Sequence, residues 1–223
     1  MSLISELQSD SINEKISLEV LLRKVYLVSR KLELNDFSDI IIKELEGYRV
    51  FEEDNSDCER IPSYRLVKGC LKSFNPVYGW TPVIIDDQSL EQAITVRYMY
   101  QSITELQDLY NAEVDPIIFL SGEMNARLSK GSDGVLTQFG VCLSHASIGH
   151  ILNSVRNLIL RWVLDLEFAG ITGDGVQFSD QEIETANANT EIHNYINNFY
   201  NSVDRIQIQQ GTIGSNMEVD TSI

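Results

Sequence analysis

The 223-residue sequence has few cysteines, no long hydrophobic run and few basic residues relative to acidic ones. Its cysteines, Cys58, Cys70 and Cys142, are widely spaced and lack metal-ligand spacing, so we expect reduced thiols in a cytoplasmic protein. Arg156 and Arg161 interrupt the most apolar segment, which leaves no uncharged run near the ~18 residues of a membrane span. The N-terminal residues also lack the apolar core of a signal peptide. We therefore expect no membrane association.

The shortage of basic residues sets a limit on the partners of the chain. The sequence has 17 Lys and Arg against 33 Asp and Glu, which gives a net charge of −16 and a pI near 4.5. Such a protein repels a phosphate backbone, so we expect no broad nucleic-acid binding, although a local basic patch is compatible with these numbers. The length and the 43% hydrophobic content are sufficient for a buried core.

Common catalytic and metal-binding patterns are also missing. The sequence has no G-x-S-x-G, H-E-x-x-H or Walker motif. His145 and His150 lie five residues apart at a predicted helix start, so they do not share a helix face. Gly173-Asp174-Gly175 is too short for a phosphate loop and does not follow a predicted strand, which favours a structural turn. The sequence therefore predicts no metal or cofactor, and the catalytic residues, if any, stay unknown.

The strongest positive signal is a long amphipathic segment between Ser147 and Gly170. Its apolar residues recur at three- and four-residue steps, which predicts a helix with one wide buried face and Gly170 just past its end. We expect this helix to pack against a helix predicted at 17–32 or against the β-rich middle. Arg156 lies on its polar side, and a partly buried Arg156 should contact a carboxylate such as Glu46 or Glu167.

The remaining patterns predict an α+β fold with helical N- and C-terminal parts packed around a small β-rich middle. Amphipathic helices are expected at 17–32, capped by Ser17, and at 35–46, capped by Asn35 or Asp36 and ended by Gly47. Their short connection predicts an antiparallel pair. In the middle we expect an exposed loop at 50–63, a turn-rich break at 75–82 that divides the β-prone residues, and a strand from Val135 to Leu143. Capping boxes at 102–105 and 179–182 predict two further helix starts. We expect a loose N-terminal lead-in at 1–14, one globular domain at 15–203 and a C-terminal tail or edge strand at 204–223.

The tail has a pattern of its own. Ile206 and Ile208 alternate with Gln207 and Gln209, with low charge and no proline, which is typical of a strand that pairs with identical copies. Two alternatives for the tail remain open: a frayed terminus, and a strand that closes the domain's own sheet. We treat Ile206, Gln207, Ile208 and Gln209 as candidate interaction residues together with Arg156.

Two blocks of the sequence carry a family resemblance. The first is LLRKVYLVSRKLELNDFSDIIIKELEGYR at 21–49, followed by the Pro62-x-Tyr64-Arg65 motif, and the second is ILNSVRNLILRWVLDLEFAGITGDGVQFSDQE at 151–182. Together they resemble the AbiTii domain family of bacterial proteins associated with abortive infection and phage defence. The resemblance spans most of residues 15–183, and residues 75–130 add little to it. It implies a defence role and supplies no known reaction or catalytic set.

Two functional hypotheses follow. The first is a cytoplasmic anti-phage protein that acts through contacts with a protein partner or through self-assembly into a homo-oligomer. The alternative is a toxin-like hydrolase or nuclease with an active site assembled from scattered acids and Arg156. A cleft with converging titratable groups would favour the enzyme, whereas a large exposed apolar surface would favour the interaction protein.

Overall fold

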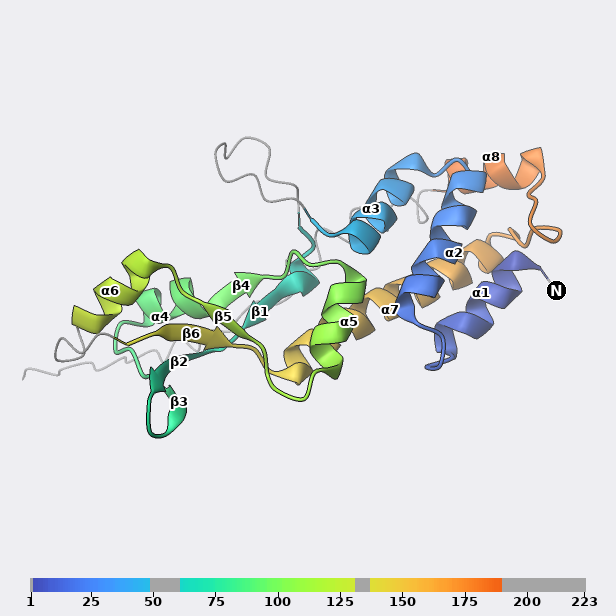
Figure 1. Cartoon of the computed structure of the whole chain (residues 1–223). Helices are drawn as coiled ribbons and strands as arrows, with labels where there is room; N and C mark the ends of the chain where they lie inside the picture. Colours follow the sequence, from blue (N-terminus) through green and yellow to red (C-terminus); the bar gives the residue numbers. More distant parts are fainter. Residues whose placement is uncertain (1, 49–60, 131–136, 190–223) are drawn as a thin grey trace, which may run out of the picture.

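The computed structural model describes residues 2–48, 61–130 and 137–189 (Figure 1). Within these ranges the elements follow one another in this order: α1 (Leu3–Ile12), α2 (Leu18–Lys31), α3 (Asn35–Glu46), the short 3-10 helix η1 (Ser63–Arg65), β1 (Leu66–Lys68), β2 (Cys70–Asn75), β3 (Gly79–Pro82), α4 (Gln88–Thr95), β4 (Val96–Tyr98), α5 (Ile103–Asn111), β5 (Ile117–Phe119), α6 (Gly122–Lys130), β6 (Phe139–Cys142), α7 (His145–Phe168) and α8 (Asp180–Ala188).

The elements separate into two regions along the long axis of the molecule (Figure 1). The helical region consists of α1, α2, α3, α5, α7 and α8, and the sheet region consists of the six strands with α4 and α6. The two ends of the described chain, together with α5 from its middle, therefore build the helical region, and the rest of the middle builds the sheet region. This arrangement confirms the predicted α+β class with a β-rich middle.

Helix α7 is the central element of the helical region. It packs mainly against α1 and α5, with smaller contacts to α2, η1 and β1. Trp162 is fully buried, and its ring lies 4.5 Å from the ring of Phe37 in α3. Ser144 caps the start of α7, and Gly170, at φ +78°, follows its end as the sequence predicted.

The N-terminal segment differs from its prediction. Residues 1–14 were expected to be a loose lead-in, but Leu3–Ile12 form helix α1, which packs along α7. Leu3, Ile4 and Leu7 are buried, and Ser2 caps the helix by accepting the backbone N–H of Ser5. Only three residues form the apolar face of this segment. The segment is therefore stable as a helix only when α7 covers that face.

Helices α2 and α3 form the predicted antiparallel pair. Ser17 caps α2 as expected, and Gly47 ends α3 with a φ of +88°. The start of α3 differs from the prediction of an Asn35 or Asp36 cap. Its N-cap is Leu34, and no side chain caps it, because Glu33 takes a positive φ of 58° and turns the chain sharply before the helix begins.

The sheet region holds a four-stranded antiparallel sheet in the order β3-β2-β6-β5 and a two-stranded pair of β1 and β4. Residues 75–82 had been predicted as a turn-rich break, but 79–82 form β3, which pairs with β2 in a hairpin. One face of the larger sheet carries Leu71, Phe139 and Val141 into the core.

The strand predicted from Val135 to Leu143 is shorter than expected. Strand β6 covers Phe139–Cys142, and all four residues are buried because β6 lies between β2 and β5. Residues 131–136 lie outside the described ranges, as do most of the loop expected at 50–63 and the entire tail, 204–223. Among the described helices, none is long and apolar enough to cross a membrane.

Candidate functional site

The first family-like block meets the Pro62-x-Tyr64-Arg65 motif in a buried ion pair. Nη2 of Arg65 in η1 donates to Oε2 of Glu44 in α3 at 2.5 Å, and both side chains are fully buried. The hydroxyls of Tyr48 and Tyr64 donate to Oε1 of the same carboxylate at 2.6 and 2.7 Å. The carboxylate thus accepts from three side chains, which satisfies its buried oxygens.

The guanidinium of Arg65 also joins the two regions of the molecule. Its Nη1 donates to the backbone carbonyls of Met99 and Gln101, at 2.9 and 2.7 Å, between β4 and α5. It lies over the ring of Tyr48, 4.6 Å from the centroid. Burial favours the neutral form of Arg65, but the charge and hydrogen bonds of Glu44 outweigh burial and raise the pKa of Arg65. We interpret this cluster as a rigid joint between helical and sheet regions.

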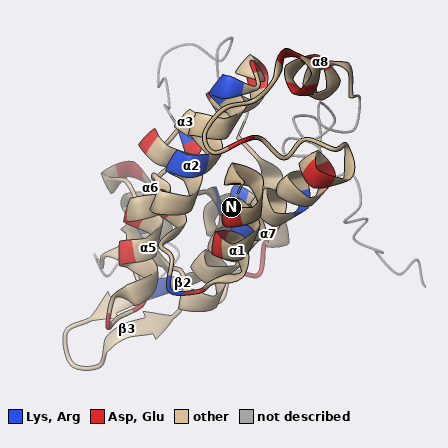
Figure 2. Ribbon diagram, turned by 90° about the vertical axis from the view of Figure 1, so that its right-hand side faces the viewer, with Lys and Arg blue, Asp and Glu red and all other residues tan. Residues whose placement is uncertain are grey.

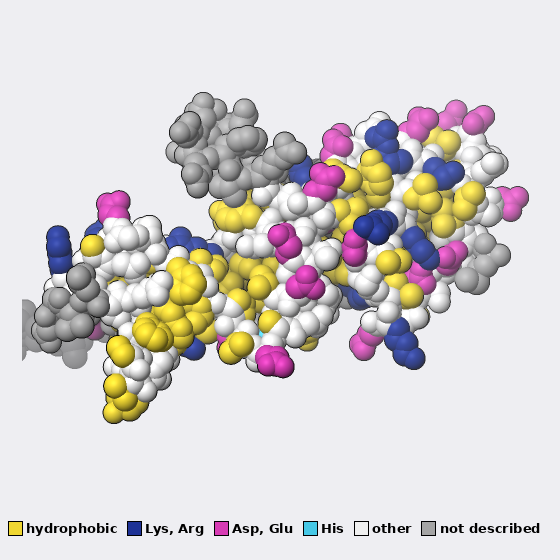
Figure 3. Space-filling view, viewed as in Figure 1, with side chains coloured by type: hydrophobic (Ala, Val, Ile, Leu, Met, Phe, Trp, Pro, Cys, Tyr) yellow, Lys and Arg dark blue, Asp and Glu magenta, His cyan; other side chains and the backbone are white. Residues whose placement is uncertain are grey.

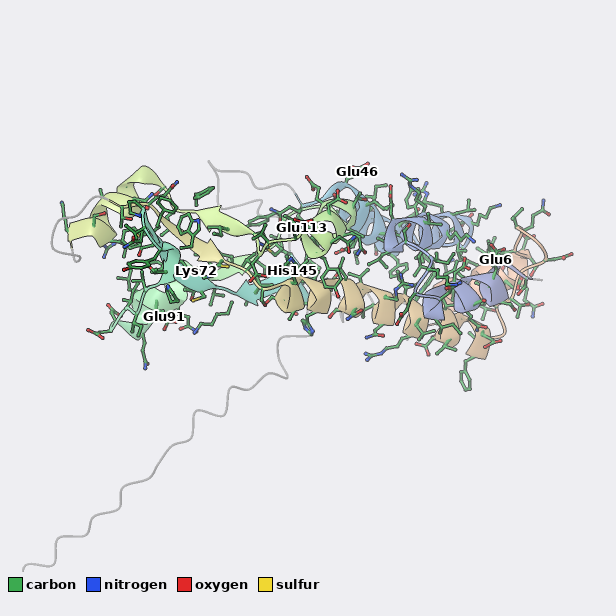
Figure 4. The ribbon with its side chains drawn as sticks, turned by 60° about the horizontal axis from the view of Figure 1, so that its bottom comes forward. Glu6, Glu46, Lys72, Glu91, Glu113 and His145 are labelled. Atoms are coloured by element: carbon green, nitrogen blue, oxygen red, sulfur yellow. The ribbon has the colours of Figure 1, made fainter. Side chains whose placement is uncertain are left out.

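Tyr48 borders a pocket of about 380 Å³ beside this joint. Figure 4 shows Glu46, one of its lining residues, at the end of α3. The lining residues are Glu46, Gly47, Tyr48, Tyr100, Gln101 and Glu105. Gly47 makes room for this wall, because a Cβ there would lie 3.0 Å from the carbonyl oxygen of Tyr100.

Three of the lining residues, Glu46, Gln101 and Glu105, carry carboxylate or amide oxygens that can accept hydrogen bonds. Oε1 of Gln101 is buried and has no hydrogen-bond partner in the described chain. The carboxylate of Glu105 already accepts from the backbone and hydroxyl of Ser102 in the predicted capping box. The lining offers no pair of nucleophile and general base. Chemically, this pocket suits a donor or a cation rather than covalent catalysis.

The Gly173-Asp174-Gly175 segment and the second capping box form one structure. The backbone N–H groups of Thr172 and Gly173 donate to Oε1 of Glu182, and Ser179 donates to Oε2. Burial opposes ionisation of Glu182, but these hydrogen bonds lower its pKa to about 2. A side chain of the chain itself therefore occupies the donors that a phosphate would need, which agrees with the interpretation as a structural turn.

Arg156 does not contact the carboxylates that were expected. Its Nη1 and Nη2 donate to backbone carbonyls in the turn that joins α1 to α2, of which the shortest contact is 2.7 Å to Ile16. The C-terminal end of α1 supplies three of these carbonyls and the connection to α2 supplies that of Ile16, so the partner of Arg156 is a helix end and the turn after it rather than an acid. Partial burial lowers the pKa of Arg156. This placement gives Arg156 a structural role at the connection between α1 and α2.

The other candidate residues form at most pairs in the described part of the chain. Nδ1 of His145, at the start of α7 (Figure 4), lies 2.8 Å from Oδ1 of Asp115, and His150 lies five residues further along the same helix. Over the described ranges, no group of three or more His, Cys, Asp or Glu is arranged to hold a metal ion. Cys70 and Cys142 are free thiols on paired strands. Ile206, Gln207, Ile208 and Gln209 lie outside the described residues.

An exposed aromatic face, which the sequence analysis missed, covers the outer side of the four-stranded sheet. Phe74 of β2 pairs directly with Trp80 of β3, with 5.5 Å between ring centroids, and Trp80 lies 5.9 Å from Phe119 of β5. Phe74 and Phe119 are 44% and 59% exposed. Lys72 and Gly140 lie on the same face by register, and at Gly140 a Cβ would collide with a neighbouring side chain of β5.

The apolar surface continues onto the β2–β3 hairpin (Figure 3). Val77 and Tyr78 at its tip are each 80% exposed, and Ile84 beyond β3 is 91% exposed. We call Phe74, Trp80 and Phe119, with the tip residues Val77 and Tyr78, the aromatic face. A continuous exposed apolar patch of this kind is typical of a contact surface.

Comparisons with known proteins agree with the resemblance seen in the sequence. A family profile described as AbiTii matches residues 2–191, which includes helix α1 and both motif blocks. Neither a curated protein nor a solved structure gives a significant match.

Proposed function

The chain belongs to the AbiTii family, and we propose that it is an anti-phage protein that acts through protein–protein contacts or self-assembly. The family name itself refers to abortive infection, the response in which an infected bacterium sacrifices itself and limits the phage. The mechanism is our inference from the chain's own surfaces.

The aromatic face is the observation that carries this proposal. Its three clustered rings expose apolar area on a rigid sheet, and aromatic residues are enriched at the energetic centres of protein interfaces. The rings are tilted against one another by 63° and 45°, so they form one packed cluster rather than separate parallel platforms for nucleic-acid bases. This geometry favours a protein partner.

The family-like motifs support the same reading, because their described residues carry structural tasks. Arg156 holds the α1–α2 turn, Arg65 holds the joint and Glu182 holds the loop before α8. The enzyme hypothesis required Arg156 and scattered acids to converge, and Arg156 instead contacts backbone carbonyls. The proposal therefore assigns function to exposed surfaces and to the tail, including Ile206–Gln209.

Phage challenge of bacteria that express the chain tests this proposal. The wild type should reduce plaque formation, and a chain that ends at residue 203 should lose this protection while its melting temperature stays unchanged. Arg156→Ala is the control for loss of stability. It should lower protection only in proportion to the amount of folded protein that is lost. Full protection by the truncated chain would rule out the tail as a contact element.

A further inference from the structure

We propose that the aromatic face binds the tail of a second copy of this chain, residues 204–223. This inference rests on the proposed function and specifies its partner. The rings of Phe74, Trp80 and Phe119 form the centre of the contact, and Lys72 lies on the same face of the sheet (Figure 4).

The tail matches this face in chemistry. It offers Ile206, Ile208 and Ile213 as branched apolar side chains that can cover aromatic rings. Beyond position 205 its charged residues are Glu218 and Asp220, and both are acidic. The described residues of the sheet region, 61–100, 116–130 and 137–143, hold six Lys or Arg against four Asp or Glu. The sheet region is therefore the part of an acidic protein that repels an acidic tail least.

The place where the tail begins favours a second copy over the same molecule. The described chain ends just after α8, and Asn187 of α8 donates to the carbonyl of Leu32 at the end of α2, remote from the sheet region (Figure 1). Residues 190–205 span at most about 55 Å when fully extended. Helix α7 alone accounts for about 36 Å of the separation, and the sheet lies beyond its N-terminal end. An intramolecular contact would thus require residues 190–205 to cross more than the length of α7 in an extended form.

Charge also argues against direct packing of two aromatic faces. A symmetric contact would enclose Lys72 of both copies within one apolar interface, which is unfavourable because neither copy's aromatic face offers a carboxylate to pair with it. A tail that leaves the opposite end of each molecule avoids this arrangement. Repetition of the same contact links copies head to tail, and such a heterologous contact either closes into a ring or extends into a filament.

The two tryptophans provide a direct readout on the full chain. Trp162 is fully buried and Trp80 lies in the aromatic face, so a change in tryptophan emission with protein concentration reports on Trp80. The wild type should form larger species in sedimentation as concentration rises, and its emission should shift to the blue in the same range. Phe119→Ser and Ile208→Lys should each weaken association about tenfold or more, because each removes one side of the contact.

Phe168→Ser is the matched control, since Phe168 is 90% exposed but belongs to the helical region. It should associate as the wild type does. A synthetic peptide of residues 204–223, added to the full-length Ile208→Lys chain, should restore the blue shift, and it should fail to do so in a chain that also carries Phe119→Ser. Circular dichroism and melting curves establish that each variant is folded.

Three outcomes would overturn the inference. If the wild type stays monomeric and its tryptophan emission equals that of Ile208→Lys, the tail does not bind this face. A tail-dependent blue shift in a monomer, independent of concentration, places the tail of the same molecule on the face. Association that Ile208→Lys abolishes but Phe119→Ser leaves intact means that tails pair with one another, and in that case the proposed function survives while this inference fails.

Discussion

The two tryptophans of the chain lie in opposite environments, one in each region. Trp162 is fully buried in the helical region against Phe37, whereas Trp80 belongs to a ring cluster on the outer side of the sheet. Both regions expose some large hydrophobic residues, but most of the buried core lies in the helical region, whereas the exposed rings that contact one another lie on the sheet. The main source of stability and the clustered contact surface are therefore separated along the molecule.

Charge separates the regions in the same way. The described helical segments, 2–48, 101–115 and 144–189, hold 19 Asp or Glu against 8 Lys or Arg, while the sheet region is close to balance. Acidic residues occur along α1, α5 and α8 (Figure 2). A protein with this distribution has one strongly acidic end and one end that tolerates an acidic partner.

The largest effect should come from breaking the helical core. Trp162→Ala should lower the free energy of unfolding by about 3–5 kcal/mol, because it leaves a cavity where α7 meets α3. Trp80→Ala should cost about 1 kcal/mol, which is the size of an aromatic pair contact on a surface. Denaturant unfolding of both variants measures these two changes in the free energy of unfolding. Equal changes would contradict the separation of core and contact surface.

The joint between the regions should be nearly as sensitive. Arg65→Ala leaves the carboxylate of Glu44 buried without its cation and should cost about 3–5 kcal/mol. The double variant with Glu44→Ala should lose less unfolding free energy than the two single variants lose together, because neither buried charge is then left without its partner. Strict additivity in a double-mutant cycle would show that the pair is not coupled.

Arg156→Ala should have an intermediate effect. Removal of a charged donor from the carbonyls at the end of α1 should cost about 1.5–3 kcal/mol. The loss should be local, so amide hydrogen exchange in α1 should rise more than exchange in the sheet region. Uniform exchange across both regions would indicate that α1 does not open on its own.

The smallest effect concerns pH. The pKa of Glu182 is lowered to about 2 from an ordinary 4.5, so its ionised form stabilises the fold fully above about pH 4.5. That stabilisation is lost as the pH falls toward 2. Glu182→Gln should remove this part of the acid dependence and cost about 1 kcal/mol at neutral pH, as for loss of a helix cap. Acid titrations of unfolding that coincide for both proteins would contradict this role.

Local signals predicted much of the fold. The capping boxes at Ser102 and Ser179, the Ser17 cap and the glycines at 47 and 170 all have the predicted roles, because each depends on neighbours within a few residues. Helix α1 was missed because its three buried apolar residues form a stable face only against α7. Arg156 was assigned the wrong partner because sequence does not show that a helix end lies beside it.

The contact surface could not be predicted for a related reason. Phe74, Trp80 and Phe119 come together only through the register of β3, β2, β6 and β5, which connects residues 45 positions apart. The one available signal was the pairing of Phe74 and Trp80 around the tight Asn75–Gly79 turn, which resembled a break rather than a hairpin. Long-range strand pairing is set by tertiary packing and not by local propensity.

Phage protection by the Trp80→Ser variant tests the central claim most directly, with Phe168→Ser as the control for loss of an exposed aromatic side chain. The separation of core and contact surface predicts that Trp80→Ser keeps the wild-type circular dichroism spectrum and nearly its melting temperature, yet loses protection, while Phe168→Ser keeps both. Wild-type protection by Trp80→Ser at equal expression would show that the aromatic face is not the functional surface.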